Sequence, residues 1–262
     1  MRIYDSETYH QDVYDDKVRV YGEGLFHGNV TCDKMTVPGS AKVGGNVECR
    51  HKLGAAGSLI INGDAVTKDK LSVPGKLIVN GNLSYVRSFR LFGELKVVGN
   101  IRAYDDLSVV GRLDCNGSIV TDGNVRAHSK INVNGSIMSR RDVDLTSGHS
   151  VIQGDVYGYN VEISGNTEIF GKIYYVNSVS TNKISPADPR PEKISPEDLS
   201  YMIDAAETVQ KPQKIPQAQT PSINMEKNGM LSQQVEKQNY CPYCGAKISS
   251  TTKFCAGCGM EV

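Results

Sequence analysis

Four cysteines near the C-terminus have the spacing of a metal site. They form two C-x-x-C pairs, Cys241/Cys244 and Cys255/Cys258, which ten residues separate. Two such pairs can bring four thiolates to the corners of a tetrahedron, which is the closed geometry of structural zinc. Because cysteine fills all four positions, the pattern predicts one structural Zn²⁺ per chain and leaves no open position for catalysis.

The run CPYCGAKISSTTKFCAGCG resembles the short zinc ribbons found at the ends of many bacterial proteins. Iron is the competing metal, because rubredoxins have similar cysteine pairs, but there a much longer insert separates them. Residues 240–262 are too few to bury a core of their own, so metal binding is expected to supply the folding energy. Lys247 and Lys253 are the only basic residues of the module, so we expect a protein partner. A purely structural role and nucleic-acid binding are the alternatives.

An 18-residue repeat precedes this module. Its clearest copy begins at Leu71 and reads LSVPGK LIVNGN LSYVRS, with apolar residues at the first and third places of each hexad. This alternation predicts short strands with one apolar face, and the glycines predict corners. Such a repeat is typical of a solenoid, here an all-β, three-sided parallel β-helix over residues 18–182. Nine turns at about 4.8 Å would give a rod of roughly 43 Å. The repeats begin at Val18, Met35, Leu53, Leu71, Phe89, Leu107, Val125, Val143 and Val161, and Val179 opens a partial tenth.

Two types of β-helix have about 18 residues per turn. The left-handed type usually has one aliphatic residue per hexad, whereas this chain has two and slips to 17 residues between Val18 and Met35. Both features favour the right-handed form. The run GNIRAYDDLSVVGRLDCNGSIVTDGNVRA, within residues 18–182, resembles bactofilins, the bacterial polymer-forming cytoskeletal proteins. The resemblance implies a right-handed coil that assembles end to end into filaments without nucleotide. Residues 1–17 lack the short apolar membrane-targeting stretch that some members carry.

The segments beside the repeat differ from it in composition. Residues 1–17 carry five acidic and two basic side chains, and we expect a flexible tail or a cap over the first turn. Residues 183–239 are expected to form a linker with one helix over about 196–210. Ser195 can cap this helix, and Leu199, Met202, Ile203 and Ala206 would form an apolar stripe. We expect the stripe to pack against the C-terminal end of the rod, with partner binding as the alternative.

Two apolar surfaces of the predicted rod are candidate interfaces. In the last full turn, Phe170, Tyr174 and Val176 point outward close to the terminal edge, and they are the candidate polymer interface. A second set lies at the fourth place of each repeat, where a solvated face would be polar. Its members are Tyr21, Pro38, Ala56, Pro74, Phe92 and Val110. They predict a lateral interface, for bundling of rods or for docking the helix at 196–210. Plain surface exposure is the alternative.

Composition narrows the function classes. The 262 residues hold 29 basic and 29 acidic side chains, so nucleic acid is not an expected partner. Because the sequence has no transmembrane-length apolar run and no signal-peptide core, we expect a cytoplasmic protein of bacteria. Peripheral association with the inner face of the membrane is left open. Cys32, Cys49 and Cys115 fall on inward places and are expected to be core residues; a Cys32–Cys49 disulfide is not expected in a reducing compartment.

Together these features predict a non-enzymatic, self-assembling cytoskeletal scaffold with no small-molecule substrate. Its coils would stack end to end as a homopolymer, and the tethered ribbon would recruit a protein partner. One alternative is a monomeric β-solenoid module that binds a protein or an envelope component. The other is a hexapeptide-type β-helix enzyme, but the five histidines fall on different sides and turns and suggest no catalytic triad.

Overall fold

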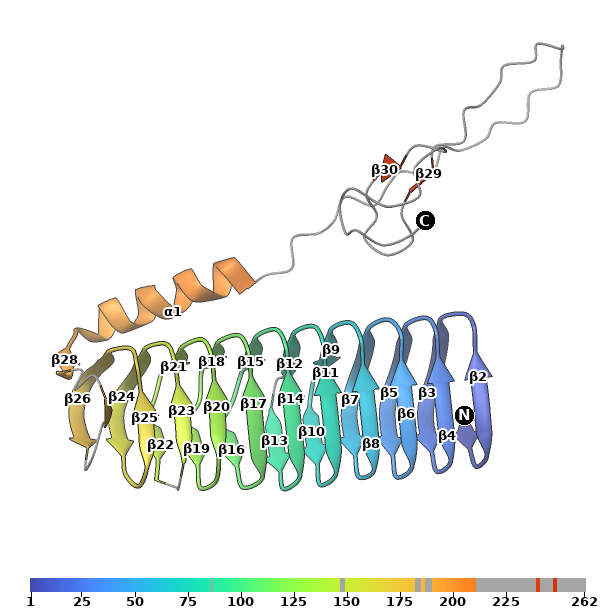
Figure 1. Cartoon of the computed structure of the whole chain (residues 1–262), viewed down its shortest axis with the longest axis horizontal. Coiled ribbons are helices and arrows are strands. Elements are labelled where there is room, and N and C mark those ends of the chain that lie inside the picture. Colours follow the sequence, from blue (N-terminus) through green and yellow to red (C-terminus); the bar gives the residue numbers. More distant parts are fainter. Residues whose placement is uncertain are drawn as a thin grey trace, which may run out of the picture. The chain divides into compact units, whose positions relative to one another are not determined.

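The computed structural model describes residues 1–85, 87–146, 149–181, 185–186, 190–210, 239–240 and 247–248. The chain divides into two compact units, 1–213 and 214–262. The first unit is a parallel β-solenoid of about ten turns with one helix beside it (Figure 1). The predicted fold class is therefore confirmed, and the hand of the coil stays a prediction.

Three ladders of parallel strands form three sides of the coil, one for each hexad of the repeat. Side two corresponds to the second hexad and is a separate sheet. Its strands are β2 (Ser6–Tyr9), β4 (Glu23–Phe26), β6 (Ser40–Val43), β8 (Ser58–Ile61), β11 (Lys76–Val79), β14 (Glu94–Val97), β17 (Arg112–Cys115), β20 (Ile131–Val133), β23 (Ser150–Ile152), β25 (Thr167–Ile169) and β27 (Ser185–Pro186).

Sides one and three, the first and third hexads, join into one 17-stranded sheet. The join arises because five long strands cross the corner between them: β3 (Val13–Val20), β5 (Val30–Val37), β7 (Val47–Ala55), β24 (Val156–Ile163) and β26 (Ile173–Thr181). The remaining strands of side one are β1 (Arg2–Ile3), β10 (Lys70–Val73), β13 (Ser88–Leu91), β16 (Leu107–Val109), β19 (Val125–Ala127) and β22 (Val143–Leu145). Those of side three are β9 (Ala65–Thr67), β12 (Leu83–Tyr85), β15 (Ile101–Ala103), β18 (Ile119–Thr121), β21 (Ile137–Ser139) and β28 (Glu192–Lys193).

The strand register follows the predicted repeat. Val18 pairs with Met35, seventeen residues on, and Leu53 pairs with Leu71, eighteen residues on. The inward places hold a continuous apolar core, in which Leu59, Leu77 and Leu95 stack in successive turns with no exposed surface. Cys32, Cys49 and Cys115 are buried free thiols, as the inward positions predicted, and the Sγ atoms of the first two are 3.3 Å apart.

The coil extends beyond both predicted limits, 18 and 182. Residues 1–17 are not a flexible tail: β1 pairs with β3 and β2 pairs with β4, so they add a first turn. The reason is that Ile3 supplies a buried residue and Tyr9 a ring stacked on Phe26, at the places that the repeat requires. At the other end β27 pairs with β25 and β28 with β26, which adds a short turn.

Glycine and asparagine make the tight corners. At Gly57 a Cβ atom would lie 2.0 Å from the carbonyl oxygen of Gly39 in the preceding turn, so no larger side chain fits without displacement. At another corner the Asn29 side-chain oxygen accepts the backbone N–H of Asn46, 2.8 Å away, and Asn46 does the same for Asp64. These side chains thus form part of a hydrogen-bonded ladder along the coil.

The strand register slips near residues 143–160. Val133 pairs with Ile152, nineteen residues on, and Val156 pairs with Ile173, seventeen residues on. His149 has a positive φ of 30°, which marks the irregular corner. Ser147 and Gly148 lie outside the described residues.

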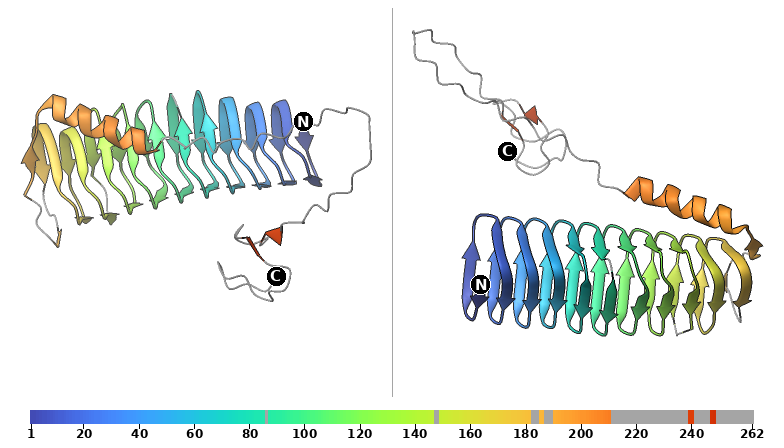
Figure 2. Two further views of the ribbon diagram at one scale, coloured as in Figure 1. Left: turned by 90° about the horizontal axis from the view of Figure 1, so that it is seen from above. Right: turned by 180° about the vertical axis from the view of Figure 1, so that it is seen from behind.

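One helix, α1 (Pro196–Gln210), follows the coil and has the predicted bounds. Its start is a reciprocal cap, in which Ser195 Oγ accepts the backbone N–H of Asp198 at 3.0 Å and donates to the Asp198 carboxylate at 2.8 Å. Two acidic residues of the first turn, Glu197 and Asp198, suit the positive end of the helix dipole. From the last turn of the coil, α1 runs back along side three (Figures 1 and 2).

Candidate docking surfaces and the C-terminal module

An apolar patch on side three holds α1. Leu199 and Ile203 of the helix are buried against Val120, Tyr157 and Val176 of the coil. Each buried aliphatic side chain contributes about 1.5–3 kcal/mol. Met202 and Ala206 pack at the edge of this cluster, so the predicted apolar stripe is confirmed. The expected position is wrong, because the helix lies on the side of the coil and not over its C-terminal end.

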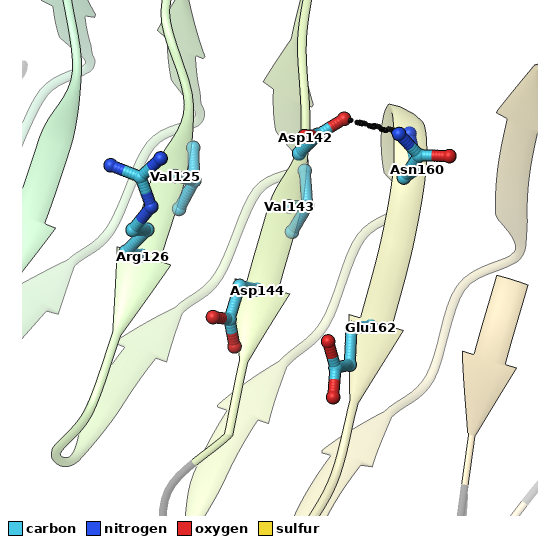
Figure 3. A pocket seen from close by; sticks show the side chains of 7 residues that line it. All are labelled: Val125, Arg126, Asp142, Val143, Asp144, Asn160 and Glu162. Carbon is cyan, nitrogen blue, oxygen red and sulfur yellow. Dashed lines mark hydrogen bonds between the residues drawn. The ribbon is translucent and has the colours of Figure 1, made fainter. Parts of the chain in front are cut away.

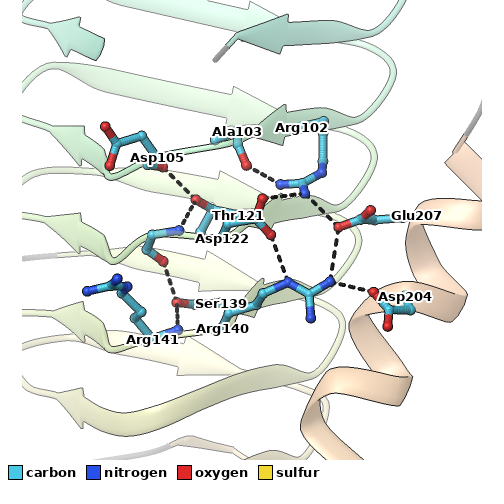
Figure 4. Close-up of polar contacts among 11 residues, drawn as sticks. Arg102, Ala103, Asp105, Thr121, Asp122, Ser139, Arg140, Arg141, Asp204 and Glu207 are labelled. Carbon is cyan, nitrogen blue, oxygen red and sulfur yellow. Dashed lines mark hydrogen bonds and ion pairs between the residues drawn. The ribbon is translucent and has the colours of Figure 1, made fainter. Parts of the chain in front are cut away.

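An ionic cluster fixes the far end of the helix (Figure 4). Arg102 pairs with Asp122 of the coil at 2.8 Å and with Glu207 of α1 at 2.6 Å. Arg140 likewise pairs with Asp122 at 2.8 Å and with Asp204 at 2.5 Å. Burial opposes the positive charge of Arg140, but the hydrogen bonds to the two aspartates outweigh it and raise its pKa.

Sequence reasoning missed this docking site, although a signal for it exists. Outward places of side three should be polar, yet Val120, Met138, Tyr157 and Tyr174 follow one another in register over four turns. The rings of Tyr157 and Tyr174 stack with their centroids 4.6 Å apart. The same test that singled out the fourth-place column would have identified this column as the surface that α1 covers.

Of the three residues of the candidate polymer interface, the structure covers two and leaves the third exposed. Val176 is buried and Tyr174 partly buried in the cluster beneath α1, so neither is free for a contact between copies. Phe170, which directly follows β25, is 42 % exposed, but β27 adds a strand beyond β25, so Phe170 does not lie in the terminal turn. The prediction failed because the coil extends past residue 182 and the helix returns along its side.

The fourth-place column lies at the corner between sides one and two, and we call it the apolar ridge. Its members are Tyr4, Tyr21, Pro38, Ala56, Pro74, Phe92 and Val110, all exposed. The structure adds Tyr4, whose ring stacks on Tyr21 at 5.1 Å. Because α1 packs on side three, the ridge does not dock this helix, and that alternative is wrong.

Charged side chains form two further surface features. An open hollow of about 170 Å³ on side one is lined by Asp142, Asp144 and Glu162 among others (Figure 3). Within the described residues no group of three or more His, Cys, Asp or Glu side chains has the geometry of a metal site. At the corner between sides three and one, Arg50 pairs with Asp33 at 3.5 Å and Lys68 with Glu48 at 3.3 Å. These exposed pairs partly neutralise the basic side chains there.

The C-terminal module contains a small hairpin. β29 (Asn239–Tyr240) and β30 (Lys247–Ile248) pair in antiparallel fashion, with Asn239 opposite Ile248. Cys241, Cys244, Cys255 and Cys258 lie outside the described residues; in the sequence, the first two fall between β29 and β30. A hairpin around a C-x-x-C pair, together with four possible thiolate ligands, fits a structural zinc site.

The fold and this module define a parallel β-solenoid protein with a small C-terminal domain. A family model described as a zinc-ribbon domain matches residues 240–262. Comparisons with curated proteins and with solved structures gave no match. Among the described residues, no helix is both long enough and apolar enough to cross a membrane.

Proposed function

We propose that this protein is a non-enzymatic cytoskeletal scaffold whose coils stack end to end into filaments, as in the bactofilins that its repeat resembles. The observation that carries the proposal is the position of α1. Because the helix packs on side three, it covers neither end of the coil. In the described part of the chain, β2 pairs only with β4 and β28 only with β26, so each end presents an open strand edge. Open edges of this kind add further strands.

The zinc ribbon is the second part of the proposal. Cys241, Cys244, Cys255 and Cys258 would hold one Zn²⁺, which would supply the folding energy of the module. A folded ribbon on a tether of about 30 residues could recruit a protein partner to a filament. We place this scaffold in the bacterial cytoplasm, with or without peripheral contact to the membrane.

One observation favours the alternative of a monomeric binding module. Glu7 occupies an inward position of the first turn, in register with Gly24, where later turns place Leu59 and Leu77. Its carboxylate accepts a hydrogen bond from Tyr9, which raises the Tyr9 pKa to about 12. An inward charge at an edge is a common way to block strand addition.

Negative-stain electron microscopy of the purified full-length protein, without nucleotide, separates the two functions. Filaments whose width is that of one coil or a few coils support the scaffold. Dispersed rods at all protein concentrations and salt conditions would reject the scaffold and support the monomeric binding module. Analytical ultracentrifugation of the same samples gives the size distribution in solution, so that adsorption to the grid cannot create or hide the polymer.

A further inference from the structure

The apolar ridge combines a protruding side chain with a hollow. Phe92 is 61 % exposed and stands at the corner one turn beyond Pro74. On the other side of Pro74, Gly54 occupies a side-one place that holds Thr36 and Ser72 in the adjacent turns. The missing side chain leaves a hollow of about 80 Å³, lined among others by Pro38, Ala56 and Pro74.

The protrusion and the hollow are spaced for self-recognition. Ala56, Pro74 and Phe92 follow one another in successive turns, so the hollow and the ring lie two turns apart, or about 10 Å. An antiparallel two-fold axis through Pro74 places Phe92 of each copy against the hollow of the other. A contact of this kind is isologous, because residue i meets j and j meets i. Parallel pairing would instead place the Phe92 ring of one copy against the Phe92 ring of the other.

We propose that the apolar ridge is a lateral interface with a second copy of this chain, antiparallel and centred on Pro74. The same operation sets Val110 against Pro38. It also sets Glu23 of one copy opposite Lys130 of the other, at both ends of the contact. Both side chains are exposed, so long side chains of opposite charge can meet there.

Two pairs of like charge beside the ridge also come together in this arrangement. Lys76 of one copy would face Lys76 of the other across the axis. Within each copy, however, the Lys76 ammonium is already 3.4 Å from the Glu94 carboxylate. Arg126 would face Arg19, and it is 3.1 Å from Asp106 within its own coil. The like charges that approach each other are therefore partly neutralised before the copies meet.

The size of the ridge determines how strong the contact is. Five turns, from Pro38 to Val110, span about 19 Å, and a corner strip of that length buries less than the roughly 1,000 Å² of a stable independent interface. Single copies should pair weakly. Copies joined end to end would pair at many points at once, so the contact would bundle filaments. The inference does not depend on filaments, because weak pairing of single coils can be trapped covalently.

The test uses full-length, zinc-loaded protein with single cysteine substitutions and mild oxidation by diamide. Pro74→Cys should give a dimer whose 74–74 disulfide is identified by mass spectrometry. A mixture of Ala56→Cys and Phe92→Cys proteins should give a 56–92 link in preference to 92–92. Val98→Cys, which is 41 % exposed at another corner, gives the background level. Linking of Pro74→Cys at that background level, or a dominant 92–92 link, would overturn the proposal.

A charge at the protruding position gives a second measurement. Phe92→Arg in the Pro74→Cys protein should lower the rate of the 74–74 link at least about tenfold, because a guanidinium in the hollow would be desolvated and would face the ammonium of Lys52, which also lines the hollow. Circular dichroism of this variant confirms that the coil is folded. An unchanged linking rate in a folded variant contradicts the proposal. Absence of filaments in the wild type bears on end-to-end stacking alone, since the cross-link reports on side-to-side pairs.

Discussion

Arg102, on side three of the coil, and Glu207, near the C-terminal end of α1, form an ion pair at 2.6 Å. The Arg102 side chain is only 11 % exposed and also pairs with Asp122 of the coil. A mostly buried cation with two carboxylate partners is costly to leave half paired. The helix therefore has a fixed end as well as an apolar face. The ion pair and the apolar face together keep α1 on side three of the coil and not over its end.

Loss of the apolar contact should release α1 without unfolding the coil. Ile203 is fully buried beneath the helix, and we expect Ile203→Ala to weaken docking by about 2 kcal/mol. Hydrogen exchange of the amides of 196–210 should then become at least tenfold faster, while the strands keep their protection. Tyr201→Ala is the matched control, because Tyr201 is 74 % exposed on the same helix. Equal exchange in the two variants would show that the ionic cluster alone holds the helix.

Metal should be needed by the ribbon and not by the coil. We expect one zinc per chain by elemental analysis, and its loss after treatment with a strong chelator. The chelated protein should keep its β-sheet circular dichroism and become sensitive to protease within residues 240–262. Cys241→Ser should abolish stoichiometric zinc, whereas Cys115→Val, in the core of the coil, should not. A chelator that melts the coil, or a wild-type protein without zinc, would be incompatible with this assignment.

The Cys115 thiol should make the stability of the coil fall at alkaline pH. Burial raises the pKa of Cys115 from 9.0 to about 12, so the unfolded chain loses this proton more easily than the folded one. The contribution of the protonated Cys115 thiol to the free energy of unfolding is complete below pH 9. It decreases as the pH rises towards 12, by about 1.4 kcal/mol per pH unit. Cys115→Val matches the Val97 and Val133 neighbours in its column. Denaturant unfolding should show a shallower alkaline decline for this variant, and parallel curves would refute the assignment to Cys115.

The sequence could predict what repeats and could not predict what interrupts the repeat. Apolar alternation and corner glycines predicted the register, because every turn needs inward apolar residues and tight corners at the same places. The first turn was missed because Glu7 stands in a leucine column and breaks the pattern, although Tyr9 and Ile3 complete the turn. The side position of α1 was missed because it depends on Val120, Met138 and Tyr157, which become neighbours only when the turns are stacked. The assignment of the four C-terminal cysteines as zinc ligands needs no such stacking, since their spacing is local, and it stays a prediction.

Removal of the inward charge at the N-terminal end should favour end-to-end assembly. Glu7 is exposed and stands where an apolar residue would continue the core, so any stacking at this end must desolvate its carboxylate. Glu7→Gln keeps the size and a hydrogen-bond acceptor for Tyr9 but removes the charge. We therefore expect longer filaments, or a critical concentration at least about tenfold lower, by sedimentation and electron microscopy. Glu162→Gln, an exposed acid at an outward place of side one with a paired strand on either side, is the matched control. If Glu7→Gln and Glu162→Gln assemble alike, the N-terminal end is not the stacking surface. If neither they nor the wild type assemble, the protein is the monomeric binding module.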